Sequence, residues 1–346
     1  MSDLPADGRS LEELVELVLG APRLYTREDV AAAAGTDVEA ARALWRGMGF
    51  PDVGEVRAFT GQDVEGLRTV VDLVRDGVLD EAAAVDVARA LGQTGSRLAE
   101  WQVGTFARRL AERGALDASD GVRPDELDAL YDEVATVLPA LERLVVLPWR
   151  RHLAAAVVRA VAEADAAADP DDETTGLLTV GFADLVGFTR LTRRLTAGEL
   201  ARLVERFEAV SADVVAMTGA RLVKTLGDEV LFVAESPGQA VETALRLHAA
   251  HADDDEVPEL RIGLATGEVV SRMGDVFGTT VNRAARLTSL ASAGATWADR
   301  PTVDAVRAPD GHRLERLVVS ARSVGPRALR GLGVTWPYEI TGAVQD

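Results

Sequence analysis

The chain has 346 residues, of which 47% are hydrophobic, and it carries a formal net charge of −19 and no cysteine. This length exceeds one ordinary hydrophobic core and predicts two domains. The acidic balance disfavours a nucleic-acid-binding protein, which needs a basic surface, and the lack of cysteine excludes disulfides, thiolate zinc sites and cysteine nucleophiles. There is no signal-like N-terminus and no apolar stretch of about 18 residues that could span a membrane. We therefore expect a soluble, acidic, cytoplasmic protein.

Residues 1–165 are expected to form an all-α domain. Apolar residues recur at helical spacing from Ser10 to Leu19, which predicts a first amphipathic helix. Thr26, with Asp29 three residues later, approximates a capping box at the start of a second helix. Further helices are predicted at 61–75, 80–91, 95–113 and 123–138, and a kinked linking helix containing Pro148 at 140–165.

A helix, a turn at Gly35 and a helix from Asp37 to Trp45 resemble the helix-turn-helix that begins MerR-like regulators. Arg42 and Arg46 are the only basic residues on the second helix. Because this helix begins with acidic residues in an acidic chain, we favour a packing unit over a DNA-binding element.

Residues 166–176 are acidic and contain proline, which predicts a linker. A second domain is expected at 177–346, where short apolar runs alternate with amphipathic helices. Strands are predicted at 177–183, 221–225, 229–233, 259–266, 313–319 and 336–340, and helices at 197–217, 237–252 and 280–291. The core order βαββαβ predicts an α+β, ferredoxin-like fold.

Two carboxylates in this domain suggest a metal site. Asp184 ends the first apolar strand, and Asp228 lies in the turn of the central hairpin. Carboxylates on neighbouring elements can hold two hard cations, and the amides of residues 185–189 can face a phosphate. Gly-Asp is also an ordinary turn dipeptide, so Asp228 alone is a weak signal.

Three motifs in this order resemble those of class III adenylate cyclases: Phe182-Ala-Asp-Leu-Val-Gly-Phe-Thr189, Lys224-Thr-Leu-Gly-Asp228 and Asp275-Val-Phe-Gly-Thr-Thr-Val-Asn-Arg-Ala-Ala-Arg286. The resemblance covers about residues 174–346. It implies conversion of ATP to 3′,5′-cyclic AMP and pyrophosphate. The alternative is a catalytically silent nucleotide-binding regulator with the same fold.

The resemblance also implies roles for individual residues. Asp184 and Asp228 would hold two ions per site, Mg²⁺ or Mn²⁺, and Lys224 and Asp275 would read adenine. The transition-state pair would be Asn282 and Arg286, which lie four residues apart and hence on one helical face. The remaining substrate-binding candidates are Val186, Gly187, Phe188 and Thr189 in the turn after the first strand, and Arg330, with Arg327 as an alternative, for the triphosphate.

In this family the metal-binding and base-reading residues of one site come from different subunits. The resemblance therefore implies a homodimer with two composite sites.

The segments Leu24-Tyr-Thr-Arg-Glu-Asp29, Arg46-Gly-Met-Gly-Phe-Pro51 and Ala58-Phe-Thr60 resemble the regulatory domain of actinobacterial pH-responsive adenylate cyclases. This implies a helical, dimeric domain that inhibits at neutral or alkaline pH, and a fatty-acid ligand between its helices. His152 in the linking helix is a candidate pH sensor, because histidine titrates near neutral pH. It is equally well a surface residue, and buried carboxylates with raised pKa values are another candidate.

Overall fold

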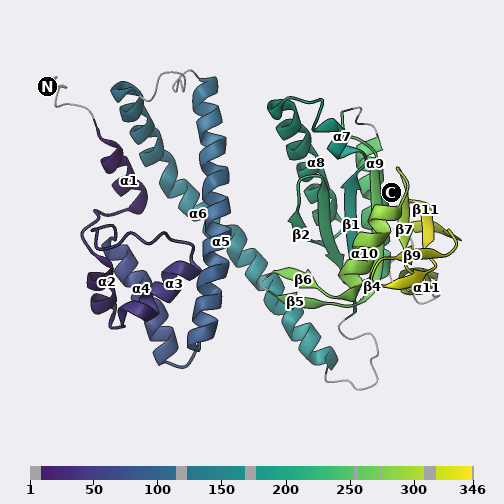
Figure 1. Cartoon of the computed structure of the whole chain (residues 1–346), viewed down its shortest axis with the longest axis horizontal. Helices are drawn as coiled ribbons and strands as arrows, with labels where there is room; N and C mark the ends of the chain where they lie inside the picture. The colour runs from purple at the N-terminus through teal and green to yellow at the C-terminus, as the bar shows by residue number, and fades with distance from the viewer. Residues whose placement is uncertain are drawn as a thin grey trace. The chain divides into compact units, whose positions relative to one another are not determined.

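The computed structural model describes residues 9–113, 123–167, 177–252, 254, 256–272, 274–307 and 317–344. The chain divides into two compact units, 1–157 and 158–346, which are described separately (Figure 1). Within the described residues, no helix is long and apolar enough to cross a membrane.

The N-terminal unit is built of helices. They are α1 (Leu11–Leu19), α2 (Arg27–Ala34), α3 (Val38–Gly47), α4 (Gly61–Arg75), α5 (Glu81–Glu112) and α6 (Pro124–Ala167), which extends into the second unit. The predicted capping box is present, because the Thr26 and Asp29 side chains each accept a hydrogen bond from the other's backbone amide. Trp45 of α3 stacks on Phe59 at 4.7 Å between ring centroids, inside the core formed by α2, α3, α4 and the start of α5.

Two of the predicted helix boundaries are wrong. Residues 80–91 and 95–113 belong to the single helix α5, which passes through Gly92. A Cβ atom at Gly92 would lie 2.2 Å from the Met48 carbonyl oxygen, so glycine here permits close packing against the end of α3. Likewise, 123–138 and 140–165 form one helix, α6, with Pro139 and Pro148 inside it. The helix surface around Pro148 is exposed, so water can satisfy the carbonyls that proline leaves without a donor.

The second unit contains the predicted βαββαβ core. Its elements are β1 (Leu177–Leu185), α8 (Ala197–Met217), β2 (Arg221–Thr225), β3 (Glu229–Ala234), α9 (Pro237–Ala252) and β4 (Leu260–Glu268). The strands lie in the order β2-β3-β1-β4 with antiparallel pairing. The sheet continues through β7 (Thr296–Ala298), β11 (Tyr338–Val344) and β8 (Leu317–Ser323). The α+β, ferredoxin-like prediction is thereby confirmed.

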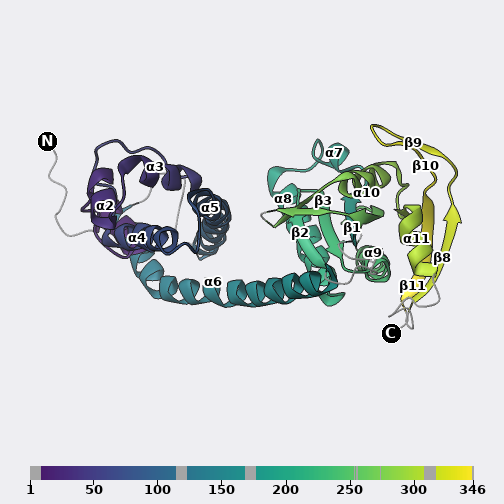
Figure 2. The same ribbon diagram turned by 90° about the horizontal axis from the view of Figure 1, so that it is seen from below.

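Successive side chains of β1 face opposite sides of the sheet, as the pleat requires. Ala183 and Leu185 join the core under α8 and α9, whereas Val180 and Phe182 join a second core under α10 (Thr279–Leu290). Figure 2 shows α9 and α10 on opposite sides of β1. Both faces of the central strands are therefore covered.

Several short elements were not predicted. They are α7 (Phe188–Leu191), β5 (Val270–Arg272), β6 (Asp275–Phe277), β7, α11 (Arg300–Arg307), β9 (Arg327–Leu329) and β10 (Gly333–Thr335). Two other predictions are only partly testable. Helix α6 runs to Ala167 and 168–176 lie outside the described residues, as do 313–316 of the strand that is described from Leu317.

Candidate active site

The metal-binding candidate Asp184 lies near the end of β1, in a row of charged side chains across three strands. It pairs in register with Glu229 on β3 and with Arg261 on β4. The guanidinium of Arg261 donates to Asp184 Oδ2, with Nε and Nη2 both at 2.5 Å. Because Asp184 is 7% exposed, this contact gives the buried carboxylate a counter-charge.

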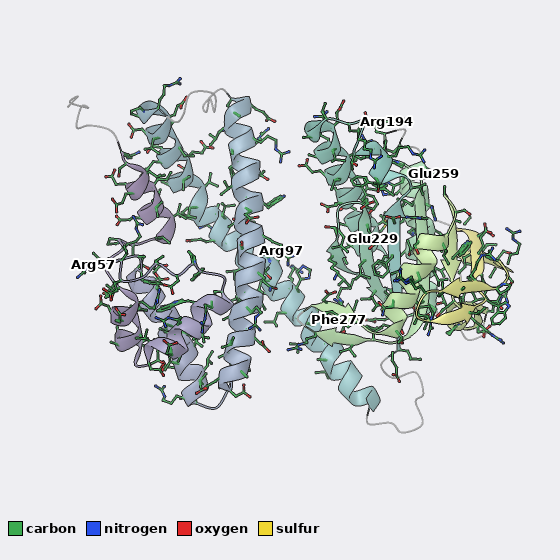
Figure 3. All side chains as sticks on the ribbon, viewed as in Figure 1. Arg57, Arg97, Arg194, Glu229, Glu259 and Phe277 are labelled. Atoms are coloured by element: carbon green, nitrogen blue, oxygen red, sulfur yellow. The ribbon has the colours of Figure 1, made fainter. Side chains whose placement is uncertain are left out.

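The carboxylates of Asp184, Asp228 and Glu229 interact with one another here, opposed by the positive charges of Arg261 and Lys224; Glu229 is labelled in Figure 3. Burial, and then the neighbouring charges of Asp184 and Asp228, raise the pKa of Glu229 to about 7. Burial also raises the pKa of Asp184, against the opposing effect of its hydrogen bond and charge interaction with Arg261. A bound cation would reduce this repulsion, since carboxylate oxygens are the ligands that hard divalent cations prefer.

Asp228 is brought beside β1 by the tight turn between β2 and β3. Gly227 occupies a left-handed conformation with φ of 73°, and the Leu185 amide donates to the Asp228 carbonyl at 2.9 Å. No group of three or more His, Cys, Asp or Glu side chains among the described residues forms a self-sufficient metal cluster. Two aspartates are nevertheless a suitable set for Mg²⁺, which commonly binds one or two carboxylates together with substrate phosphates.

The turn after β1 offers fewer backbone amides to an anion than predicted. The amides of Leu185 and Val186 donate to the carbonyls of Asp228 and Glu259, each at 2.9 Å, so they are not free to bind phosphate. The reason is that main-chain pairing continues past the end of β1. Gly187, with φ of 76°, is the N-cap of the short helix α7, and the first amides of a helix have no intrahelical acceptor. Only residues 187–189 retain the predicted geometry.

The two adenine-reading candidates are in direct contact. Lys224 on β2 and Asp275 at the start of β6 are 51 residues apart in sequence, yet Lys224 Nζ lies 2.5 Å from Asp275 Oδ2. Both side chains are about one-third exposed, at 36% and 29%. Burial acts to raise the pKa of Asp275, but the hydrogen bonds from Lys224 and from the Val276 amide outweigh it, so the pKa is lowered. The pair therefore presents a charged donor and a charged acceptor side by side at the surface.

Asn282 and Arg286 lie on α10, and both side chains are exposed. Buried Ala284 and Leu287 anchor the other face of the helix. Within the described residues, no hydrogen bond or ion pair joins Asn282 or Arg286 to the aspartates of the same chain. The structure therefore groups Asp184 with Asp228 and Lys224 with Asp275, and keeps the helical pair separate.

Of the remaining candidates, Arg330 and His152 are exposed and Arg327 is half-buried. Arg330 lies in the turn between β9 and β10, whereas Arg327 is on β9 with its guanidinium 5.6 Å from the centre of the Trp297 ring. Arg330 is therefore the more available cation of the two. His152 is exposed on α6.

Sequence reasoning missed Arg261 and Glu229 as members of the site. Arg261 follows Asp184 by 77 residues, and only the pairing of β1 with β4 brings them together. The available signal was a basic residue, Arg261, inside the strand predicted at 259–266. Glu229 directly follows Asp228, and its place opposite Asp184 depends on the register of β1 and β3.

Several known proteins and one protein family are similar to this chain in sequence. Residues 171–316 match a family model described as "Adenylate and Guanylate cyclase catalytic domain". An "Adenylate cyclase" of Streptomyces coelicolor is 44% identical over 94% of this chain and 88% of its own length. An "Adenylate cyclase" of Streptomyces griseus is 48% identical over 85% of this chain and 71% of its own length. A "pH-sensitive adenylate cyclase" of Mycobacterium tuberculosis is 31% identical, covering 80% of this chain and 74% of its own length.

Proposed function

The chain belongs to the family of adenylate and guanylate cyclases, and from this premise we propose that it converts ATP to 3′,5′-cyclic AMP and pyrophosphate. The observation that carries the choice of ATP is the contact between Lys224 and Asp275. Relatives of 44% and 48% identity that are named adenylate cyclase support the same choice.

The adenine edge offers an acceptor at N1 and a donor at its 6-amino group. A lysine ammonium can only donate and an ionised aspartate can only accept, so Lys224 and Asp275 together complement that edge. Their mutual ion pair holds both side chains in place before the base enters. The test is a comparison of ATP with GTP as substrates; equal turnover of both would contradict adenine recognition by this pair.

Asp184 and Asp228 are proposed to hold two Mg²⁺ or Mn²⁺ ions per site. When bound, these ions would promote ionisation of the ribose 3′-hydroxyl and neutralise charge on the triphosphate. The excess negative charge around Asp184 and the raised pKa of Glu229 support a cation here. Arg261 holds one carboxylate oxygen of Asp184 and so fixes the direction of the other.

The remaining groups act on the substrate directly. Asn282 would orient the ribose, and Arg286 would stabilise the charge that develops on the reacting phosphoryl group, for which a planar, permanently charged donor is suited. The amides of residues 187–189 and the guanidinium of Arg330 are proposed to bind the triphosphate. Because the attack is intramolecular, catalysis consists mainly of positioning and charge stabilisation.

We further propose that the active form is a homodimer in which each site combines Asp184 and Asp228 of one chain with the base-reading residues and helix α10 of the other. Exposed apolar side chains on α6 support dimerisation. Val146, Trp149, Leu153, Val157 and Val161 are spaced by three or four residues and are 45–55% exposed, which defines one apolar stripe on a helix.

Complementation tests this arrangement. Asp184→Ala and Arg286→Ala chains should each be inactive alone, whereas a heterodimer of the two retains one site with neither substitution. Random 1:1 pairing should restore about a quarter of the wild-type activity, because half of the dimers are mixed and each has one intact site. Verified heterodimers without activity would contradict the composite site.

The N-terminal unit is proposed to regulate the cyclase in response to pH, as the name of the mycobacterial relative suggests. His152, the candidate sensor, is exposed on the linking helix α6. The pH profile of cyclic AMP formation should shift in His152→Ala. An unchanged midpoint would remove His152 from the mechanism and leave the buried carboxylates as candidates.

A fatty acid is a proposed ligand of the N-terminal unit. This unit contains a cavity of about 270 Å³ lined by the aromatic rings of Trp45, Phe50 and Phe59 and by Arg27, Arg42 and Arg46. Asp52, which pairs with Arg27, and Asp63 also belong to the lining. Such a lining suits a carboxylate attached to an apolar tail. Oleate binding measured by calorimetry should weaken in Arg42→Ala, and unchanged binding would exclude this cavity.

A further inference from the structure

Helix α10, which carries Asn282 and Arg286, is attached to the sheet by polar contacts on its inner side. Near its start, Thr280 Oγ1 donates to the Glu268 carbonyl at 2.8 Å. Near its end, the Thr288 hydroxyl, whose nearer acceptor is the Ala284 carbonyl of α10 at 2.9 Å, also lies 3.3 Å from the Phe182 carbonyl. Both contacts use main-chain acceptors and carry no charge.

The contact between them is an ion pair. Arg283 Nη1 donates to Asp299 Oδ2 at 2.8 Å. Arg283 directly follows Asn282 and precedes Arg286 by three residues, so it lies between the two proposed transition-state residues along the helix. The contact therefore acts on the part of α10 that carries them.

Asp299 is itself held rigidly. It is 1% exposed, and its Oδ1 accepts hydrogen bonds from Thr302 Oγ1 at 2.6 Å, the Thr302 amide at 3.1 Å and the Thr266 amide at 3.3 Å. Three donors on one oxygen and the guanidinium on the other fix the orientation of this carboxylate. Arg283 is its one charged partner among the described residues.

The attachment reaches β1 and β4, at the Thr179–Thr266 pair of their ladder. Thr302 Oγ1 and Thr266 Oγ1 are 2.7 Å apart, and Thr266 Oγ1 is 2.9 Å from Thr179 Oγ1. Thr179 lies on β1, which carries Asp184, and Thr266 lies on β4, which carries Arg261. All three threonines are buried. A continuous polar chain thus connects α10 to the two strands that place the metal-binding carboxylate.

We propose that Asp299 is a positioning residue of the cyclase reaction: through Arg283 it fixes the rotation of α10 and thereby the places of Asn282 and Arg286. The proposal rests on the proposed cyclase function. Side chains extend about 5–6 Å from a helix axis, so a rotation of about 10° moves their ends by roughly 1 Å. A displacement of this size can lower a rate by about 100-fold, because catalysis depends on orientation.

The test is steady-state kinetics of full-length Asp299→Asn. Asparagine keeps an oxygen that caps α11 but loses the charge that holds Arg283. The kcat for cyclic AMP formation should fall by about 10- to 100-fold while the KM for ATP changes by less than about 3-fold. The matched control is Asp304→Asn, on the same helix, whose carboxylate pairs with Arg300 at the surface; it should leave kcat unchanged.

Complementation separates positioning from general loss of structure. Asp299→Asn should restore activity when mixed with Asp184→Ala, because the intact site then takes α10 from the second chain. It should not restore activity with Arg286→Ala, since both changes then affect α10. Restoration with both partners, or an unchanged kcat in Asp299→Asn, would overturn the proposal.

Two further measurements cover the remaining outcomes. If Asp299→Asn does not fold, substitutions of Arg283 test the same contact. Arg283→Lys should retain kcat within about 3-fold, because lysine keeps the positive charge, whereas Arg283→Gln should lower kcat by at least about 10-fold. Equal effects of the two substitutions would overturn the proposal. Hydrogen exchange of the amides of residues 279–290 should be several-fold faster in Asp299→Asn than in the wild type. If the wild type forms no cyclic AMP, the proposed function fails, and unchanged exchange would refute the attachment independently.

Discussion

His248 should make the stability of the second unit depend on pH. It is half-buried on α9, and its Nε2 lies 3.0 Å from Oγ1 of buried Thr296 on β7. Burial, with a smaller contribution from the charge of His251, lowers the pKa of His248 from 6.5 to about 4. The folded state therefore holds this histidine neutral in a pH range where the unfolded chain protonates it.

The sign and size of the effect follow from these two pKa values. Above pH 6.5 neither state binds the proton, and the free energy of unfolding has its full value. Between pH 6.5 and 4 the unfolded state binds more protons than the folded state, so the free energy of unfolding decreases as the pH is lowered. Relative to its value above pH 6.5, the loss is about 2 kcal/mol at pH 5 and about 3 kcal/mol below pH 4. Because His248→Asn cannot titrate, its stability relative to wild type should rise by about 2 kcal/mol from pH 7.5 to pH 5.

The assay is urea unfolding at both pH values. Unfolding is detected by pulsed hydrogen exchange of the β4 amides, which report the second unit alone. The control is His152→Asn, because His152 is exposed on α6 and its loss should leave the pH dependence of β4 unfolding as in the wild type. If His248→Asn and wild type lose stability in parallel between pH 7.5 and 5, the reasoning about buried neutral His248 is refuted.

Three more outcomes are expected. Arg261→Met should raise the Mn²⁺ concentration for half-maximal activity by about 10-fold, because loss of its charge favours protonation of Asp184; an unchanged metal dependence would contradict this role. Asp275→Ala should lower kcat/KM for ATP by about 100-fold, because the bound base loses an acceptor and Lys224 its partner, and an equal loss for GTP would argue against base recognition. Removal of divalent cations by chelation should abolish cyclic AMP formation and added Mn²⁺ should restore it; activity that persists in verified metal-free buffer would contradict metal binding by Asp184 and Asp228.

The main elements of both units were predictable because each has a local signal. The Thr26 capping box, the helix at 197–217 and the hairpin around Gly227 lie where hydrophobic spacing and turn residues indicate. Gly92 misled the prediction because glycine usually interrupts a helix, whereas here its missing Cβ admits the Met48 backbone. That requirement comes from another helix and has no local signal.

The site was only partly predictable for the same reason. Motif resemblance supplied Lys224 and Asp275, and their contact depends on the position of β6, a three-residue strand too short to be recognised from its sequence. Arg261 and Asp299 act through partners on distant segments. Their roles depend on strand register and helix packing, which a single sequence does not state.

The most direct test of the central claim is cyclic AMP formation from ATP by the full-length chain with Mn²⁺, measured beside the Asp184→Ala/Asp228→Ala variant. The account predicts cyclic AMP and pyrophosphate in equal amounts from the wild type and none from the variant. A folded, dimeric wild type that binds ATP and releases no cyclic AMP would contradict it.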